Sequence, residues 1–374
     1  MTAVDMDRWT HIAGETVAGV TRSVFLKDQS LHVLAVSRPW AVALQLMQPA
    51  LMKKISAELG EGAVQFLQVH GPITEDDDTT ADNDSAPELR MFAEHIQPVF
   101  EHADLAASGY RHSLPTGHAE FDEFTGGLPL GSLTVVGGFP GAGSSTFVLG
   151  LVRNLSLQHG ATTAYLTLDS RPDDLTGRLL SAETRIKHAY LRSGLMNDED
   201  WTLLARRITE IADAPLILDR PRDRDISAIT QQITELAETG CLLVVIDPLH
   251  MVLARRDLPY ENREREVSEI IRRLKALALD LDIAIVVTSH LTNNPGPRQP
   301  IPGRPSLADL RDSGVIAHVA DMVILLHRPD MWNVDDFRGG EVDLIVAKHR
   351  TGPAFTCTVA HQLHLSRLVD IVRS

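Results

Sequence analysis

A glycine-rich segment is the part of the chain best suited to chemistry. It reads Gly138-Phe139-Pro140-Gly141-Ala142-Gly143-Ser144-Ser145-Thr146, and it follows an apolar, strand-like run at residues 133–136. A helical pattern then continues to a stop at Gly160. Glycines let backbone N–H groups curl around an anion, and a helix N-terminus adds partial positive charge. The pattern predicts a nucleotide-phosphate loop whose contacts come from Gly138, Gly141, Gly143, Ser144, Ser145 and Thr146.

One position of this loop departs from the motif G-x-x-x-x-G-K-S/T. Gly138 and Gly143 are the motif's glycines and Ser145 is its magnesium-coordinating hydroxyl, but Ser144 occupies the lysine position. The lysine normally contacts the β- and γ-phosphates and neutralises charge in the transition state. The simpler alternative is a strand-to-helix turn in which Ser144 or Ser145 caps the helix.

A carboxylate at the end of another apolar run completes the expected site. Residues 242–246 are Leu, Leu, Val, Val and Ile, and Asp247 follows them directly. A carboxylate at a strand end opposite a phosphate loop orients magnesium, so Ser145 and Asp247 are the predicted metal ligands. Alternatively, Asp247 forms an Asx turn at the strand end.

The elements that must position these residues alternate regularly through the C-terminal part of the chain. Continuous apolar strands separated by longer helical patterns indicate a parallel sheet covered on both faces. The fold class predicted for this part is therefore α/β with a central, mostly parallel sheet. The strand-like runs are residues 133–136, 164–168, 216–218, 242–246, 283–288, 322–326 and 344–346.

An acidic stretch divides the chain. Residues 75–85 carry a dense negative charge and no large apolar side chain, which is typical of a flexible linker. Before it, residues 30–36 alternate like a strand, residues 40–59 form an amphipathic helical pattern and residues 64–69 resemble a second strand. The predicted organisation is a small α+β domain at 1–73, a linker at 74–100 and an α/β domain at 101–374. The alternative is a solvated acidic loop within one domain.

Composition limits the function classes. The net charge is −15, so any nucleic-acid contact must come from a local basic patch. Cys241 and Cys357 are the only cysteines, too few for a disulfide framework or a cysteine-rich zinc site. The first residues have no signal-peptide pattern, and no apolar run is long enough to span a bilayer. We expect a cytoplasmic protein with no membrane partner.

From residue 109 onward the chain resembles the ATPase domain of DnaB-type replicative helicases, which has a RecA-like fold. The resemblance rests on the phosphate loop and on several other segments in the family's order, which together are highly specific. These segments are residues 114–117, 121–128, 198–201, 246–251, 309–314 and 348–353. The resemblance implies ATP and Mg²⁺ as cofactors, single-stranded DNA as a partner and a homo-oligomeric ring, such as a hexamer.

The resemblance also implies roles for further residues. Lys348 and Arg350 match the family's hairpin residues that reach the neighbouring subunit's γ-phosphate, and a strand end before a Gly-Pro turn suits that role. Asp169 stands where the family has a glutamate that polarises water, and His290 stands where it has a phosphate-sensing glutamine. With Ser144 in the lysine position, we expect ATP hydrolysis to be weak or lost.

A Pro/Gly-rich segment at residues 293–304 is the candidate DNA contact. In these ring helicases such loops line the channel, and here Arg298 and Arg304 would bind phosphates without reading sequence. An ordinary surface loop is the open alternative.

The segment from residue 7 to 72 resembles the small DciA-type (DUF721) domain, which is KH-like and helps to load the replicative helicase. The resemblance rests on residues 9–14, 30–36, 40–41 and 59–64, which are mostly apolar. We expect Trp9 and Trp40 to pack in its core. The leading interpretation is a DnaB-like DNA-replication protein with altered catalytic positions. The alternative is a non-hydrolysing pseudo-ATPase that regulates or loads the host helicase or contacts other replisome proteins. A RadA- or KaiC-like ATPase is disfavoured by residues 309–314 and 348–353.

Overall fold

The computed structural model divides into two compact units, Met1–His112 and Ser113–Ser374. The residues described are 2–27, 30–36, 40, 44, 48–59, 64, 66–70, 113–255, 260, 262–291, 303–310, 313–333 and 335–371. The expected linker at 74–100 lies outside them. None of the described helices is long and apolar enough to cross a membrane.

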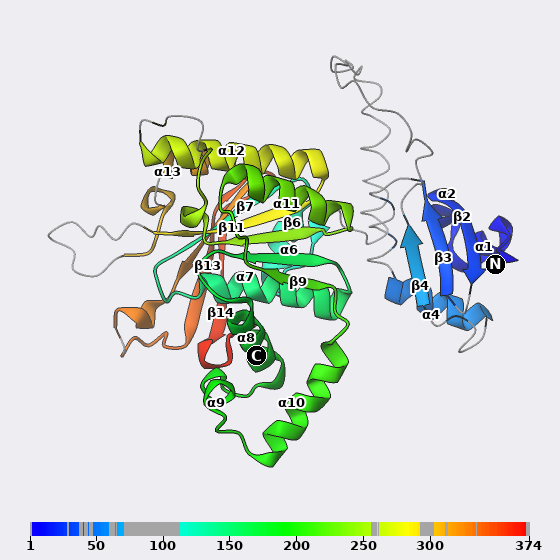
Figure 1. Cartoon of the computed structure of the whole chain (residues 1–374), viewed down its shortest axis with the longest axis horizontal. Coiled ribbons are helices and arrows are strands. Elements are labelled where there is room, and N and C mark those ends of the chain that lie inside the picture. Colours follow the sequence, from blue (N-terminus) through cyan, green and yellow to red (C-terminus); the bar gives the residue numbers. More distant parts are fainter. Residues whose placement is uncertain are drawn as a thin grey trace. The chain divides into compact units, whose positions relative to one another are not determined.

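In the described part of the first unit, three helices pack on a four-stranded sheet (Figure 1). Its helices are α1 (Met6–Ala13), α2 (Glu15–Gly19) and α4 (Gln48–Leu59). Its sheet has the order β1 (Thr2–Ala3), β2 (Thr21–Lys27), β3 (Ser30–Ala35) and β4 (Phe66–His70). Strand β3 alternates between half-buried and buried residues, as its sequence predicts. Trp9 is fully buried and its indole N–H donates to Thr21 Oγ1 at 3.1 Å, whereas Trp40 packs partly buried on the same core.

The second unit is built on a nine-stranded sheet of order β15-β14-β13-β12-β7-β11-β10-β8-β9. The strands from β12 to β9 in this order are parallel, and the last three of the chain add antiparallel strands at one edge. The parallel strands are β7 (Leu133–Gly138), β8 (Thr163–Thr167), β9 (Leu216–Asp219), β10 (Leu243–Asp247), β11 (Ala284–His290) and β12 (Met322–His327). The antiparallel strands are β13 (Glu341–His349), β14 (Phe355–Gln362) and β15 (Arg367–Asp370). The mostly parallel α/β sheet expected from the sequence is confirmed.

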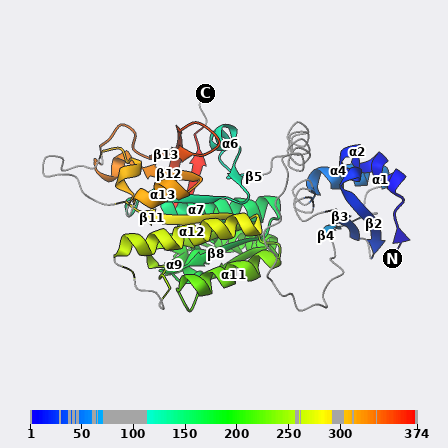
Figure 2. The same ribbon diagram turned by 90° about the horizontal axis from the view of Figure 1, so that it is seen from above.

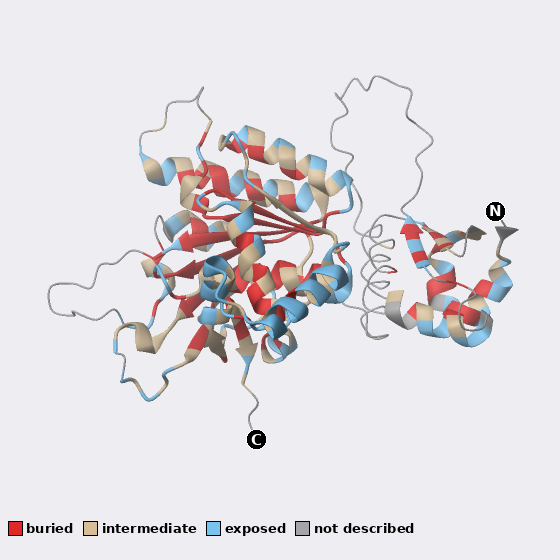
Figure 3. Ribbon diagram, turned by 60° about the horizontal axis from the view of Figure 1, so that its bottom comes forward, coloured by how far each residue is buried: buried red, intermediate tan, exposed pale blue. Residues whose placement is uncertain are grey.

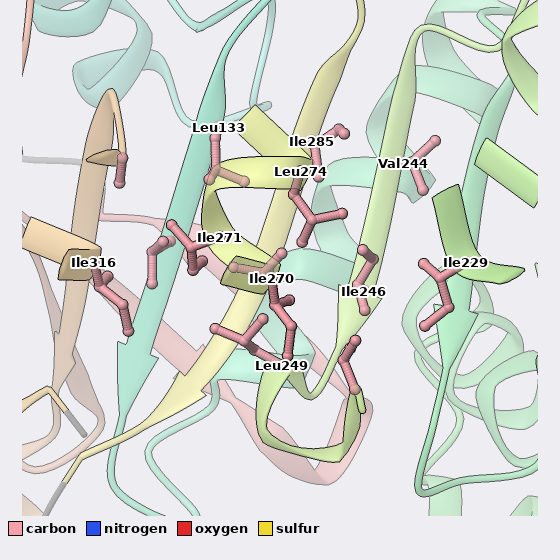
Figure 4. Packing of buried hydrophobic residues seen from close by; sticks show 14 of the residues in the cluster. Leu133, Ile229, Val244, Ile246, Leu249, Ile270, Ile271, Leu274, Ile285 and Ile316 are labelled. Atoms are coloured by element: carbon pink, nitrogen blue, oxygen red, sulfur yellow. The ribbon is translucent and has the colours of Figure 1, made fainter. Parts of the chain in front are cut away.

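Helices cover both faces of this sheet because its strands are apolar on both sides. On one face, α11 (Ile226–Glu238) and α12 (Arg263–Leu281) lie side by side (Figures 1 and 2). Their buried side chains form one cluster with the strands, which includes Ile229, Leu274 and Val244 (Figure 4). On the other face lies α7 (Ser144–Arg153), with α8 (Pro172–Thr184) beside it. Figure 3 shows the buried strands between helices whose outer surfaces are exposed.

The remaining elements connect or flank these layers. They are β5 (Ser113–Leu114), α6 (Ala119–Thr125), β6 (Leu128–Pro129), the π-helical turn η1 (Asn154–Gln158), α9 (His188–Ser193), α10 (Asp198–Ile211), η2 (Leu249–Met251), η3 (Leu307–Asp309), α13 (Ser313–Val319), η4 (Pro329–Met331) and η5 (Leu363–Leu365). Because the strands from β12 to β9 are parallel, their carboxyl ends share one edge. This edge carries the ends of β7, β8, β10 and β11, where the candidate site lies.

Candidate nucleotide-binding site

The turn between β7 and α7 has the backbone of an anion cradle. Gly141 and Gly143 have φ values of +88° and +104°, which a residue with a side chain rarely adopts. The carbonyl of Gly143 accepts the first bond of α7, from Phe147 N at 2.8 Å. At Gly138, a Cβ atom would lie only 2.2 Å from Ser144 Oγ. The first turn of α7 leaves backbone N–H groups without intrahelical partners, and these N–H groups suit phosphate oxygens.

Ser144 sits in this cradle with an unused hydroxyl. Its Oγ atom is buried and has no hydrogen-bond partner among the residues described. A buried hydroxyl normally has a partner, and a phosphate oxygen would supply one. The donor set therefore fits a nucleotide phosphate, although it lacks the lysine charge. Ser145 and Thr146 follow on the first turn of α7, half-buried, and hydroxyl and carboxylate oxygens are the donors that Mg²⁺ prefers.

Asp247 ends β10 and is only 6% exposed. The two strands beside β10 each send one hydroxyl to its carboxylate. Tyr165 of β8 donates to Oδ2 and Thr288 of β11 donates to Oδ1. Burial, followed by the charge and hydrogen bond of Asp247, raises the pKa of Tyr165 well above its ordinary value. The sequence motifs did not point to either residue, because each strand also carries other polar side chains.

His290 and Asp169 lie at the same edge of the sheet. His290 is the last residue of β11, in register with Gly138 of β7, and its ring lies 4.3 Å from that of His250 between centroids. Asp169 follows β8 by two residues, is exposed and accepts a hydrogen bond from Ser170 Oγ at 2.9 Å. The strand order thus brings the ends carrying Asp169, Asp247 and His290 to the edge that carries the phosphate loop.

The structure places Lys348 and Arg350 elsewhere. The end of β13 pairs with Met322 at the start of β12, and Met322 pairs with Thr134 near the start of β7. Both basic residues are therefore at the opposite end of the strands from Gly138. Lys348 Nζ donates to the carbonyls of His318 and Ala320, at 3.0 and 2.6 Å.

Arg350 is engaged by a carboxylate of the same chain. Its Nη1 lies 3.1 Å from Asp321 Oδ1. Burial, and then the charge of Arg350, lowers the pKa of Lys348. Neither residue reaches the phosphate loop of its own chain.

Of the two arginines predicted to contact DNA, the structure describes one. Arg298 lies outside the described residues. Arg304 is exposed, and its guanidinium donates to Thr356 Oγ1 on β14. Arg304 is therefore placed against the antiparallel edge of the sheet.

One basic residue beside the loop was not anticipated. Arg328 follows β12, and its Nη1 donates to the carbonyl of Gly141 at 2.9 Å while its Nε donates to Asp330 Oδ1 at 2.6 Å. Nearby, Trp332 meets Phe139 edge-on, with 5.7 Å between ring centroids. Residues 328–332 thus flank the outer side of the loop, and only the adjacency of β12 to β7 reveals this.

Two family models match the chain. The model described as DnaB-like helicase C terminal domain matches residues 113–370, and the model described as Dna(CI) antecedent, DciA, matches residues 5–69. These matches confirm both resemblances expected from the sequence motifs.

Curated relatives of this chain are replicative helicases. It is 46% identical over 231 residues to "Replicative DNA helicase DnaB" of Mycobacterium intracellulare, covering 62% of this chain and 39% of that protein. For the protein of the same name from Leifsonia xyli, the identity is 38% over 272 residues, covering 72% and 58%. The matches therefore span less than two thirds of these relatives' lengths.

Solved structures support the fold. One solved ATPase domain aligns with a TM-score of 0.70 at 24% identity, covering 76% of this chain and 100% of that chain. A structure described as a DnaB-like replicative helicase and its interactions with primase aligns with a TM-score of 0.68 at 24% identity, covering 89% and 75%.

Proposed function

Because the chain belongs to the family of DnaB-like helicase C-terminal domains over residues 113–370, we propose that it binds ATP with Mg²⁺ and hydrolyses it weakly or not at all. The observation that carries this proposal is the unpartnered hydroxyl of Ser144 inside an otherwise complete phosphate cradle. The cradle accounts for binding, and the absent lysine accounts for slow chemistry.

The binding step depends on residues at one edge of the sheet. Backbone N–H groups of the first turn of α7 would hold the phosphates, and Ser144 Oγ would donate to one oxygen. Ser145 and Asp247 would hold Mg²⁺, which when bound neutralises phosphate charge. Tyr165 and Thr288 keep the Asp247 carboxylate fixed in its buried position.

Two groups that promote ATP hydrolysis in the related family are replaced in this chain. Loss of one charged or hydrogen-bonding group that stabilises a transition state slows a reaction by roughly 100- to 1000-fold. Here the lysine is absent, and Asp169 is one methylene shorter than the glutamate of the resembling family. His290 can still donate a hydrogen bond to a phosphate.

Assembly would supply the remaining charges. Lys348 and Arg350 are at the strand ends opposite the phosphate loop, so in a ring they would act on a neighbouring subunit's nucleotide. We further propose that single-stranded DNA contacts Arg298 and Arg304, and that the protein acts in DNA replication. We also propose that the chain consists of a small domain at residues 1–73, a linker at 74–100 and an α/β domain at 101–374.

A second candidate function is supported by the DciA match at residues 5–69. In this alternative, the chain is a non-hydrolysing pseudo-ATPase that docks on the replicative helicase and regulates or loads it. Both candidates share the nucleotide site, and they differ in whether Ser144→Lys restores turnover.

Nucleotide binding and hydrolysis by the purified full chain, with and without single-stranded DNA, test the proposal. We expect ATP binding with little turnover, and a gain of roughly 100-fold in turnover for Ser144→Lys. Ser193→Lys, at an exposed position on α9, is the matched control and should leave turnover unchanged. Robust DNA-stimulated hydrolysis by the unaltered chain would refute weak hydrolysis. Absence of any gain in Ser144→Lys would favour the second candidate.

A further inference from the structure

A small polar cavity lies beside helix α7. It has a volume of about 40 Å³ and is bounded by α7, α8, the segment at residues 116–118 and the start of β15. A single water needs roughly 10–15 Å³ of such space, so the cavity admits a larger group than one water. It is too small for a nucleoside. Its polar lining consists of Thr116, His118, Thr146, Arg153, Asn154, Ser366 and Arg367.

The charged groups on one wall of the cavity pair with one another. Arg153 Nη1 lies 3.3 Å from Glu183 Oε1, and Arg207 donates to the other oxygen of Glu183. One carboxylate therefore serves two guanidinium groups. Arg207 has a further partner in Glu210, at 2.8 Å, so it does not rely on Glu183 alone.

Arg367, which also lines the cavity, has no such partner among the described residues. Its Nε is buried without a hydrogen-bond acceptor, and it forms no ion pair within the part of the chain that the structure describes. Burial, and then the positive charges of Arg185 and Arg153, lowers the pKa of Arg367, while the charge of Glu183 opposes this shift. Burial is also the first cause that lowers the pKa of Arg153, although Glu183 opposes it.

The other carboxylate near this wall is already engaged. Asp370 accepts from His118 Nδ1 at 2.7 Å through Oδ1 and from Ala119 N at 2.8 Å through Oδ2. A water in the cavity could accept a hydrogen bond from the Arg367 guanidinium but would not offset its charge. An anion would satisfy both the donor and the charge.

We propose that this cavity binds a small tetrahedral oxyanion, with free inorganic phosphate as the representative ligand. Arg367 and Arg153 supply charge-assisted hydrogen bonds, and the Ser366 hydroxyl supplies a third donor. The cavity also reaches Thr146, which directly follows Ser145, so the bound anion would brace the first turn of α7, the helix that follows the phosphate loop. The site does not depend on nucleotide binding.

Calorimetric titration of the full chain with inorganic phosphate, in a chloride buffer of constant ionic strength, tests this proposal. We expect saturable binding that weakens at least tenfold in Arg367→Gln and in Arg153→Gln. Arg367→Lys keeps the charge and should weaken binding less than Arg367→Gln does. Arg206→Gln is the matched control, because that side chain is 79% exposed on α10, outside the cavity.

The phosphate loop is a competing binding site for inorganic phosphate. The variant Ser145→Ala alters that loop and leaves the cavity arginines unchanged, so it distinguishes the two sites. Binding retained in Ser145→Ala and lost in the cavity variants supports the proposal. Binding lost in Ser145→Ala and retained in Arg367→Gln overturns it, as does binding unchanged in every variant or absent from the unaltered chain. If circular dichroism shows that Arg367→Gln does not fold, the phosphate affinities of Arg153→Gln and Arg367→Lys test the proposal in its place. Displacement of phosphate by a single-stranded oligonucleotide would also overturn it, because the ligand would then be a nucleic-acid backbone.

Discussion

The phenol of Tyr165 donates a hydrogen bond to the buried carboxylate of Asp247 from the neighbouring strand. Together with Thr288 on the other side, it gives each carboxylate oxygen a protein donor. A buried carboxylate is costly unless it is hydrogen-bonded. This pair therefore holds Asp247 at the edge of the sheet that also carries the glycine-rich loop.

Removal of that phenol should destabilise the second unit. Tyr165→Phe leaves one oxygen of a buried carboxylate without its donor, so we expect the free energy of unfolding to fall by about 1–3 kcal/mol. Urea denaturation measures this change. Tyr190→Phe, at an exposed tyrosine, is the control and should change the free energy by less than about 0.5 kcal/mol. Equal stability of Tyr165→Phe and the unaltered chain would contradict the prediction.

Asp321 links three distant parts of the second unit. Its carboxylate accepts from Leu133 N at 2.8 Å and lies 2.7 Å from Lys275 Nζ and 3.1 Å from Arg350 Nη1. Because Lys275 and Asp321 are 12% and 13% exposed, Asp321→Asn leaves a nearly buried ammonium group without its counter-charge. We expect a loss of about 3 kcal/mol in the free energy of unfolding.

Urea denaturation of Asp321→Asn, with Asp280→Asn as the control, measures this loss in the free energy of unfolding. Asp280 is an exposed acid near the end of α12, so its loss of charge should have little effect. Comparable stability of the two variants would show that the Asp321 carboxylate is dispensable.

The contact of Asp370 with His118 should make stability depend on pH. The hydrogen bond from His118 lowers the pKa of Asp370, burial opposes it, and Ala119 N assists. A carboxyl whose folded pKa is depressed stabilises the fold above its unfolded pKa of about 3.9, and this stabilisation is lost as the pH falls through the folded value.

Asp370→Asn should therefore be less stable than the unaltered chain at pH 6, by no more than about 1 kcal/mol because the carboxyl is 40% exposed. The difference should shrink towards zero below the folded pKa. Thermal unfolding at a series of pH values measures it. A difference that grows on acidification would have the wrong sign for this account.

The two units should unfold separately. Trp9 is fully buried in the core of the first unit, so Trp9→Ala should cost that unit about 3–5 kcal/mol. Scanning calorimetry should show the first unit's transition lowered or lost, while the transition of the unit at residues 113–374 keeps its midpoint. A single transition that shifts as a whole would contradict this independence.

Several features of the fold and site could be read from local sequence. The glycine spacing from Gly138 to Gly143 determines a turn that few other residues can adopt, and apolar strands alternating with helices indicate a parallel sheet. Once the sheet is parallel, the strand ends at Asp169, Asp247 and His290 must share an edge. These inferences succeed because glycine conformation and hydrophobic periodicity act over a few neighbouring residues.

Other features depend on which strands become neighbours. Tyr165 and Thr288 reach Asp247 because β8 and β11 flank β10, and Arg328 reaches Gly141 because β12 lies beside β7. Asp321 bonds to Leu133, 188 positions away in the sequence, for the same reason. Apolar strands of similar composition can be ordered in many ways, so the sequence alone determined the loop, the missing lysine and the sheet type. Only the tertiary structure decided the partners of each charged group, because long-range packing sets the strand order.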